Sequence, residues 1–226
     1  MAESNPSALE QFAVAAGCDE IDLAQMALLI AAAEYPDLDV KEELRALDSL
    51  AAGACRSIGQ ERDPLARANA LSEYLFDEVG FRGNREDYYD PRNSFLNEVL
   101  SRRLGIPITL SLVYLEVGNR LGVPLVGVGM PGHFMVRISS GHEDLVIDPF
   151  HRGILLSEKE CAQRLQEVAG AAVPWDRSYL APVSNRELIE RILLNLRGIY
   201  LRRHDQPRAL RATEWLLALQ SQSPLE

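Results

Sequence analysis

The sequence predicts an α+β protein in which helices precede and follow a small antiparallel sheet. Apolar residues recur at helical spacing through most of residues 19–121. Residues 125–148 hold three short runs that are rich in β-branched residues and are broken by a Pro-Gly and a Ser-Ser-Gly turn. Helical spacing returns after Gly153. Consecutive strands joined by such short turns pair antiparallel, so the sheet is expected in the middle of the chain.

Length and composition suit one domain with a smaller appendage. The chain has 226 residues, of which 47% are hydrophobic, so it can bury a proper core. Its formal net charge of -10 argues against nucleic acid as a partner. The N-terminus lacks the apolar core of a signal peptide, and no apolar run approaches the roughly 20 residues of a membrane span. We therefore expect a cytoplasmic protein without a nucleic-acid or membrane partner.

The cysteines and histidines are spaced too widely to predict a metal site. Cys18, Cys55 and Cys161 are far apart and odd in number, and no C-x-x-C pair occurs, so neither a zinc site nor a disulfide framework is indicated. A reducing compartment fits this usage. The four histidines also lack the short spacing of a metal centre. We expect no metal and no cofactor, and we place all three cysteines in the hydrophobic core.

The first ninety residues are expected to form a helical region that packs on the core. Helices are predicted over residues 7–16, 19–35 and 40–55, and a fourth begins at Asp63-Pro64. The segment that follows, through Tyr88, is rich in glycine, asparagine and aromatic residues. Such a segment is an ordered loop that either carries function or packs its aromatic rings on the core.

The centre of the chain, residues 91–153, holds the candidate site. A helix over residues 95–104, capped by Asn93 or Ser94, leads through a tight loop into a buried helix over residues 110–121. Strands are then expected over residues 125–129, 133–138 and 145–148.

Two polar residues fall where this arrangement brings neighbouring strands together. His133 begins one strand and Asp148 ends the next. This order matches half of a Cys-His-Asp site, in which a nucleophile at a helix N-terminus is activated by a histidine whose ring is held by a carboxylate. At the helix start, where the cysteine belongs, the chain has Thr109 and Ser111. Thr109 is also a good N-cap residue for that helix.

After Gly153 the pattern is helical again. A helix is expected to start near residue 157, followed by an irregular stretch over residues 170–182. Helices over residues 185–202 and 208–219 then form a hairpin close in length to a repeat of roughly 34 residues. Because one such unit cannot bury its own face, it must pack on the domain, on a partner or on further repeats. The abrupt end of the chain favours a truncated array.

Six stretches carry a resemblance to a known family. They are LLIAAAEYPDLDV, YLFDEVGFRGN, DPRNSFLNEVLSRRLGIPITLS, LGVPLVGVGMPGHFMVRI, VIDPFHRG and NLRGIYLRRHDQPRALRATEWLLAL. Together they resemble the bacterial SirB-type proteins of the transglutaminase-like superfamily, which often carry trailing tetratricopeptide repeats. The resemblance implies a papain-like α+β core over residues 91–182, a helical N-terminal region over residues 1–90, and a tetratricopeptide-like helical hairpin over residues 183–226.

The resemblance also assigns candidate site residues. His133 and Asp148 match the histidine and aspartate of active transglutaminase-like enzymes, and the position of their cysteine falls near residues 107–109, where this chain has none. The candidate catalytic residues are therefore His133, Asp148, Thr109 and Ser111. The candidate binding residues are Tyr88, Asn93, Asn97, Gly132, His151 and Arg152.

Two function hypotheses follow, and we favour the first. The first is a non-catalytic binding or regulatory module that kept the cleft, lost the thiol, and holds a peptide or protein segment near His133. The second is a hydrolase or acyltransferase in which Thr109 or Ser111 is the nucleophile, His133 the base and Asp148 the residue that orients it. A third interpretation gives these polar residues a purely structural role.

Overall fold

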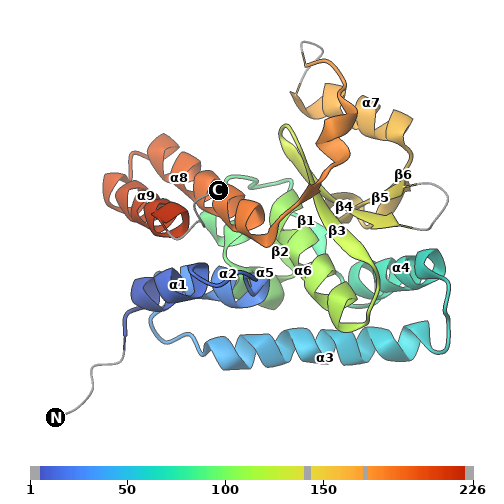
Figure 1. Ribbon diagram of the computed structural model, residues 1–226, viewed down its shortest axis with the longest axis horizontal. Helices are drawn as coiled ribbons and strands as arrows, with labels where there is room; N and C mark the ends of the chain where they lie inside the picture. The colour runs from blue at the N-terminus through green and yellow to red at the C-terminus, as the bar shows by residue number, and fades with distance from the viewer. Residues whose placement is uncertain (1–5, 140–143, 170–172, 222–226) are drawn as a thin grey trace.

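The computed structural model describes residues 6–139, 144–169 and 173–221. Within them, helices pack around a small antiparallel sheet, and the predicted α+β fold class is confirmed (Figure 1). None of the helices in these ranges has both the length and the apolar content that a membrane crossing requires.

Four α-helices in the described part of the N-terminal region each begin at a side-chain cap. The helices are α1 (Ala8–Ala16), α2 (Leu23–Ala32), α3 (Val40–Ile58) and α4 (Pro64–Ser72). Their caps are Ser7, Asp22, Asp39 and Asp63, and each side-chain oxygen accepts a backbone N–H from the first turn. That N–H has no partner inside the helix, so the cap stabilises the helix start.

The central sheet has five strands in the order β6-β5-β4-β3-β7, and each neighbouring pair is antiparallel. The strands are β3 (Leu125–Met130), β4 (His133–Ser139), β5 (Asp144–Asp148), β6 (Ile154–Leu156) and β7 (Pro182–Val183). The first three are the predicted strands. The edge strands β6 and β7 were not predicted, because two or three residues are too few to show an alternating pattern.

The sheet separates a large core from a small one, because side chains on a strand point alternately to its two faces. Phe134, Val136 and Ile138 of β4 belong to the main core on the side of α6 (Pro107–Arg120). Met135 belongs to a second cluster that includes Cys161 of α7 (Glu158–Ala169). The main core contains residues from all three predicted segments of the chain, from Phe12 to Leu219.

Helix α6 is the most buried element of the fold. Each of its first twelve residues, from Pro107 to Gly118, is buried. It starts three residues before the predicted start, because Pro107 suits the first position of a helix. It ends before Gly122, whose φ of 68° lies in the left-handed region that glycine adopts readily.

The C-terminal hairpin packs on the N-terminal helices. It consists of α8 (Asn185–Arg202) and α9 (Gln206–Ser221), which lie beside α1 in Figure 1. Phe12 of α1 meets Trp215 of α9 edge to face, with the ring centroids 4.6 Å apart. The hairpin therefore buries its apolar face on the domain itself.

Two of the three cysteines lie outside the core, contrary to our prediction. Cys161 is buried as expected, but Cys18 and Cys55 are exposed. Cys18 lies beyond the last residue of α1, and Cys55 follows the buried Ala54 on the outer side of α3. An apolar residue type therefore did not predict burial at these two positions.

Candidate functional site

His133 and Asp148 meet at one edge of the sheet. Because β4 and β5 are antiparallel, the start of β4 and the end of β5 lie at the same edge. Nε2 of His133 lies 2.9 Å from Oδ2 of Asp148. His133 is 5% exposed and Asp148 is fully buried. The contact expected from the order of the strands is therefore present.

Two further side chains surround the Asp148 carboxylate. Nδ1 of His151 lies 2.7 Å from Oδ2, the oxygen that His133 also contacts. The guanidinium of Arg164, which comes from α7, lies 3.6 Å from that oxygen and 3.5 Å from Nε2 of His151. The sequence suggested His151 as a binding residue. Arg164 was missed because no pattern in the sequence of α7 predicts that this helix packs against the end of β5. We call these four residues the Asp148 cluster.

The hydrogen bonds of the Asp148 cluster assign the tautomers of both histidines. A guanidinium can only donate, so Nε2 of His151 accepts from Arg164 and Nδ1–H of His151 donates to Asp148. Asp148 also accepts from Nε2–H of His133. In neutral His133 the unprotonated nitrogen is therefore Nδ1, which has no hydrogen-bond partner among the described residues.

The same contacts keep Asp148 ionised. Burial by itself would raise the pKa of Asp148. The hydrogen bonds from His133 and His151, and the charge of these rings when protonated, outweigh burial and hold the pKa well below its usual range. Asp148 is therefore a carboxylate at neutral pH and can hold the ring of His133 in one orientation.

His133 lines a cleft of about 230 Å³ between the sheet, the start of α6 and α8. The residues around it are Tyr88, Ile106, Pro107, Ile108, Met130, Gly132, His133, Phe134, Arg191 and Asn195. The start of α6 thus presents apolar side chains to the cleft at the position where a nucleophile is expected. Arg191 and Asn195 were missed because they lie on a helix more than fifty residues from His133 in the sequence.

The hydroxyl groups of Thr109 and Ser111 are bonded to the backbone. Thr109 is the third residue of α6, so it is not the predicted N-cap; its Oγ1 instead accepts the N–H of Ile106 at 3.1 Å. The same Oγ1 donates to the carbonyl of Asn93 at 2.7 Å. Ser111 Oγ donates to the carbonyl of Phe134 at 3.3 Å. Both residues are buried, and neither lines the cleft.

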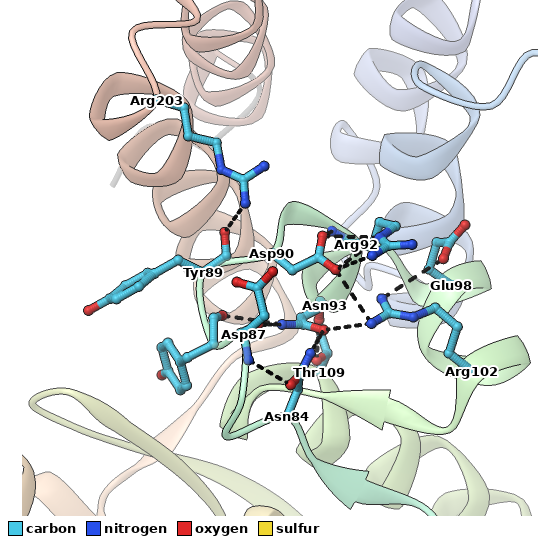
Figure 2. A network of polar contacts seen from close by, with 11 residues as sticks. Asn84, Asp87, Tyr89, Asp90, Arg92, Asn93, Glu98, Arg102, Thr109 and Arg203 are labelled. Atoms are coloured by element: carbon cyan, nitrogen blue, oxygen red, sulfur yellow. Dashed lines mark hydrogen bonds and ion pairs between the residues drawn. The ribbon is translucent and has the colours of Figure 1, made fainter.

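A polar network joins side chains of residues 84–94, the segment that precedes α5 (Leu96–Arg102), and Asn93 is its centre (Figure 2). Oδ1 of Asn93 accepts from Nδ2 of Asn84 at 3.0 Å, and its own amide donates to the carbonyl of Asp87 at 2.8 Å. Arg102 donates to the same Oδ1 at 3.4 Å and lies 3.5 Å from the Asp90 carboxylate. Asn93, proposed as a binding residue, is thus fully buried in the short 3-10 helix Pro91–Ser94. We call this the Asn93 network.

The other candidate binding residues lie in different surroundings. Tyr88 and Gly132 line the cleft with His133. Asn97 is buried in the first turn of α5 (Leu96–Arg102), and its Oδ1 has no hydrogen-bond partner in the described ranges. Arg152 forms an exposed ion pair with Asp77. The structure therefore gathers two of the six candidate binding residues at the cleft.

Three residues of the Asp148 cluster could in principle ligate a metal. Among the described residues, His133, Asp148 and His151 each offer one ligand atom, and these atoms lie within 4.8 Å of one another. The guanidinium of Arg164 lies 3.6 Å from the Asp148 oxygen and would repel a divalent cation there. The group therefore fits a hydrogen-bonded cluster better than a metal site, and the expected absence of a metal stays a prediction.

Comparison with known proteins gives one family and several relatives. The model of the Transglutaminase-like superfamily matches residues 41–194. A UPF0162 protein of Xylella fastidiosa is 39% identical over 213 residues, which cover 91% of this chain and 74% of that protein. Protein SirB1 of Salmonella typhimurium is 28% identical over 210 residues, 92% of this chain and 76% of that protein.

A shorter stretch is similar to part of a much longer protein. F-box only protein 21 of Mus musculus is 37% identical over 136 residues, which cover 57% of this chain and 21% of that protein. No solved structure matches the chain.

Proposed function

The chain belongs to the transglutaminase-like superfamily, in its SirB-type branch, and we propose that its cleft binds a peptide or protein segment without catalysing a reaction. One observation carries the proposal. At the start of α6, the residues that face the cleft are the apolar Ile106, Pro107 and Ile108, while the two hydroxyls nearby are bonded to backbone carbonyls. Among the described residues that line the cleft with His133, none is a serine, threonine or cysteine.

Cys161 does not supply the missing thiol. It lies on the far side of the sheet, in the second core beneath α7. Burial, and after it the negative charge of Asp148, raises the pKa of the Cys161 thiol to about 12. Because the thiolate is the nucleophilic form, this cysteine is unreactive at neutral pH.

The shape and chemistry of the cleft suit a segment of polypeptide. Its volume of about 230 Å³ is below the roughly 300–1,000 Å³ of pockets that enclose a small ligand, so it fits one or two side chains of a longer segment. Apolar side chains form one wall, and His133, Arg191 and Asn195 provide polar groups. This mixture of apolar contact and few polar groups is typical of side-chain recognition.

The alternative function is a hydrolase or acyltransferase that uses Thr109 or Ser111. The retained bond between His133 and Asp148 favours it, because that pair is what a hydroxyl nucleophile requires. It would also require a hydroxyl to leave its backbone acceptor, Asn93 or Phe134, and turn to Nδ1 of His133. This rearrangement makes the binding function the better supported of the two.

Selection of peptides from a random display library tests the proposal. We expect peptides that bind the wild-type protein and lose at least tenfold in affinity for an Ile108→Trp variant, whose larger side chain fills the cleft. Leu194→Trp is the control, because Leu194 is 40% exposed on α8 and does not line the cleft. In a second measurement, the bound peptide should shift the backbone amide resonances of Gly132 and His133.

Two results would overturn the proposal. One is that every selected peptide binds the Ile108→Trp variant and the wild type equally and leaves the amides of Gly132 and His133 unshifted. The other is amide hydrolysis or acyl transfer by the wild type that His133→Ala abolishes and that Thr109→Val or Ser111→Ala also abolishes. The second result would establish the alternative function.

A further inference from the structure

Arg191 brings a positive charge to the wall of the cleft, and the fold holds it there. Its guanidinium donates to the carbonyl of Gly129 at 3.2 Å and lies 5.8 Å from the centre of the Phe134 ring. A Cβ atom at position 129 would come within 2.5 Å of the Arg191 guanidinium carbon. The absence of a side chain at Gly129 therefore allows the half-buried guanidinium to lie flat on β3.

The charge of Arg191 is not matched by an acidic side chain. Within residues 6–139, 144–169 and 173–221, no carboxylate lies within ion-pair distance of Arg191, although the whole chain carries ten more acidic than basic side chains. A guanidinium has five N–H donors, and the single bond to Gly129 leaves most of them available. An anionic group that enters the cleft would meet unpaired donors in a partly desolvated place, where a charge-assisted hydrogen bond is strongest.

The neighbouring polar groups of the cleft are also donors. Asn195 lies one turn after Arg191 on α8; one N–H of its amide bonds to Ser94 at 2.8 Å, and the other is available. Burial raises the pKa of Tyr88, so its phenol stays protonated and can donate. The remaining polar atom at the cleft, Nδ1 of His133, is an acceptor in the neutral ring.

We infer that the segment bound in the cleft presents a carboxylate to Arg191 and Asn195 and an adjacent apolar side chain to Ile106 and Ile108. This inference rests on the proposed binding function and names the chemistry of its ligand. The planar guanidinium matches a carboxylate through two parallel hydrogen bonds, and Asn195 adds a third donor. The carboxylate can be an aspartate or glutamate side chain or the C-terminus of a chain.

Two peptide libraries distinguish these sources. One displays random peptides with a blocked C-terminus, and the other displays them with a free C-terminus. We expect acidic residues beside apolar residues to be enriched in the first library if a side chain is recognised. Enrichment confined to the second library, without a preference for acidic residues, would identify the terminal carboxylate.

Arg191→Gln is the decisive variant, with Arg197→Gln as its matched control on the same helix outside the cleft. We expect Arg191→Gln to weaken the selected peptide at least tenfold and Arg197→Gln to leave its affinity within twofold. Replacing the acidic residue of the peptide by its amide, or amidating the C-terminus, should cause the same loss. Combined with Arg191→Gln, that replacement should cause little further loss, because both changes remove one interaction.

The outcomes separate this inference from the function on which it rests. Peptides that depend on Ile108 but are uncharged and bind Arg191→Gln normally would overturn the carboxylate inference and leave the binding function intact. A failure to recover any peptide that depends on Ile108 or shifts the amides of Gly132 and His133 would overturn both.

Discussion

A buried polar network lies on each side of the cleft, but only one of the two networks leaves a polar atom available to a ligand. In the Asn93 network, on the side of α6, the amide and hydroxyl groups form hydrogen bonds with one another and with the backbone. The Asp148 cluster, on the side of the sheet, leaves Nδ1 of His133 without a partner in the described part of the chain. Polar residues at a site therefore differ in what they can do: the first network positions α6, and the second can meet a ligand.

The largest expected loss of stability comes from removing Asp148, on the sheet side of the cleft. Asp148→Ala should lower the free energy of unfolding by about 3–5 kcal/mol, because it leaves two histidines and Arg164 without their buried acceptor. Unfolding in urea measures the change. Asp77→Ala removes an exposed ion pair with Arg152 and should cost less than about 1 kcal/mol. Equal losses in the two variants would mean that the Asp148 cluster does not hold the end of β5.

The next largest expected loss of stability comes from removing Asn93, on the α6 side of the cleft. Asn93→Ala should cost about 2–3 kcal/mol, because the amide of Asn84 and the carbonyl of Asp87 lose their partner in a buried place. Asn97→Ala is the matched control: it removes an amide whose Oδ1 has no partner among the described residues, and it should cost about 1 kcal/mol or less. The comparison between the two sides would fail if Asn97 proved the more costly substitution in urea unfolding.

Thr109→Val separates a structural hydroxyl from a catalytic one. We expect a loss of about 1–2 kcal/mol in the free energy of unfolding, since the bonds to Asn93 and Ile106 disappear. Peptide binding at the cleft should stay within twofold of the wild type. A variant of normal stability that no longer binds the selected peptide would place Thr109 in the site.

The smallest effect is a dependence of stability on pH. The folded protein holds the pKa of Asp148 below its usual value, so the unfolded chain takes up this proton first as the pH falls. The stability that Asp148 contributes is therefore complete above about pH 4, the usual aspartate pKa, and declines below it by up to about 1.4 kcal/mol per pH unit. The difference in unfolding free energy between wild type and Asp148→Asn should shrink between pH 5 and pH 3.

The range from pH 5 to pH 3 separates the titration of the Asp148 carboxylate from that of the histidines in the unfolded chain. A histidine has an ordinary pKa of about 6.5, so in the unfolded chain it is already protonated throughout the window. A difference between wild type and Asp148→Asn that stays constant from pH 5 to pH 3 would contradict the lowered pKa of Asp148. The measurement is urea unfolding at half-unit intervals of pH.

Much of the fold could be predicted because it follows from local signals. The starts of α2 and α4 coincide with Asp22 and Asp63, whose side chains cap the first turn wherever the helix packs. His133 and Asp148 could be brought together because strands joined by short turns place the start of one beside the end of the next. The exposure of single side chains was harder to predict, since Cys18 lies two residues beyond the buried Ala16 and Cys55 one residue beyond the buried Ala54.

The sequence by itself determined the capped helices, the order of the strands and the meeting of His133 with Asp148. Only the tertiary structure decided that the hydroxyls of Thr109 and Ser111 are bonded to the backbone, and that Arg164 and Arg191 join the site. The physical reason is the range of the interactions. Caps and short turns depend on neighbours in the chain, whereas a hydrogen-bond partner or a cleft wall depends on how distant elements pack together.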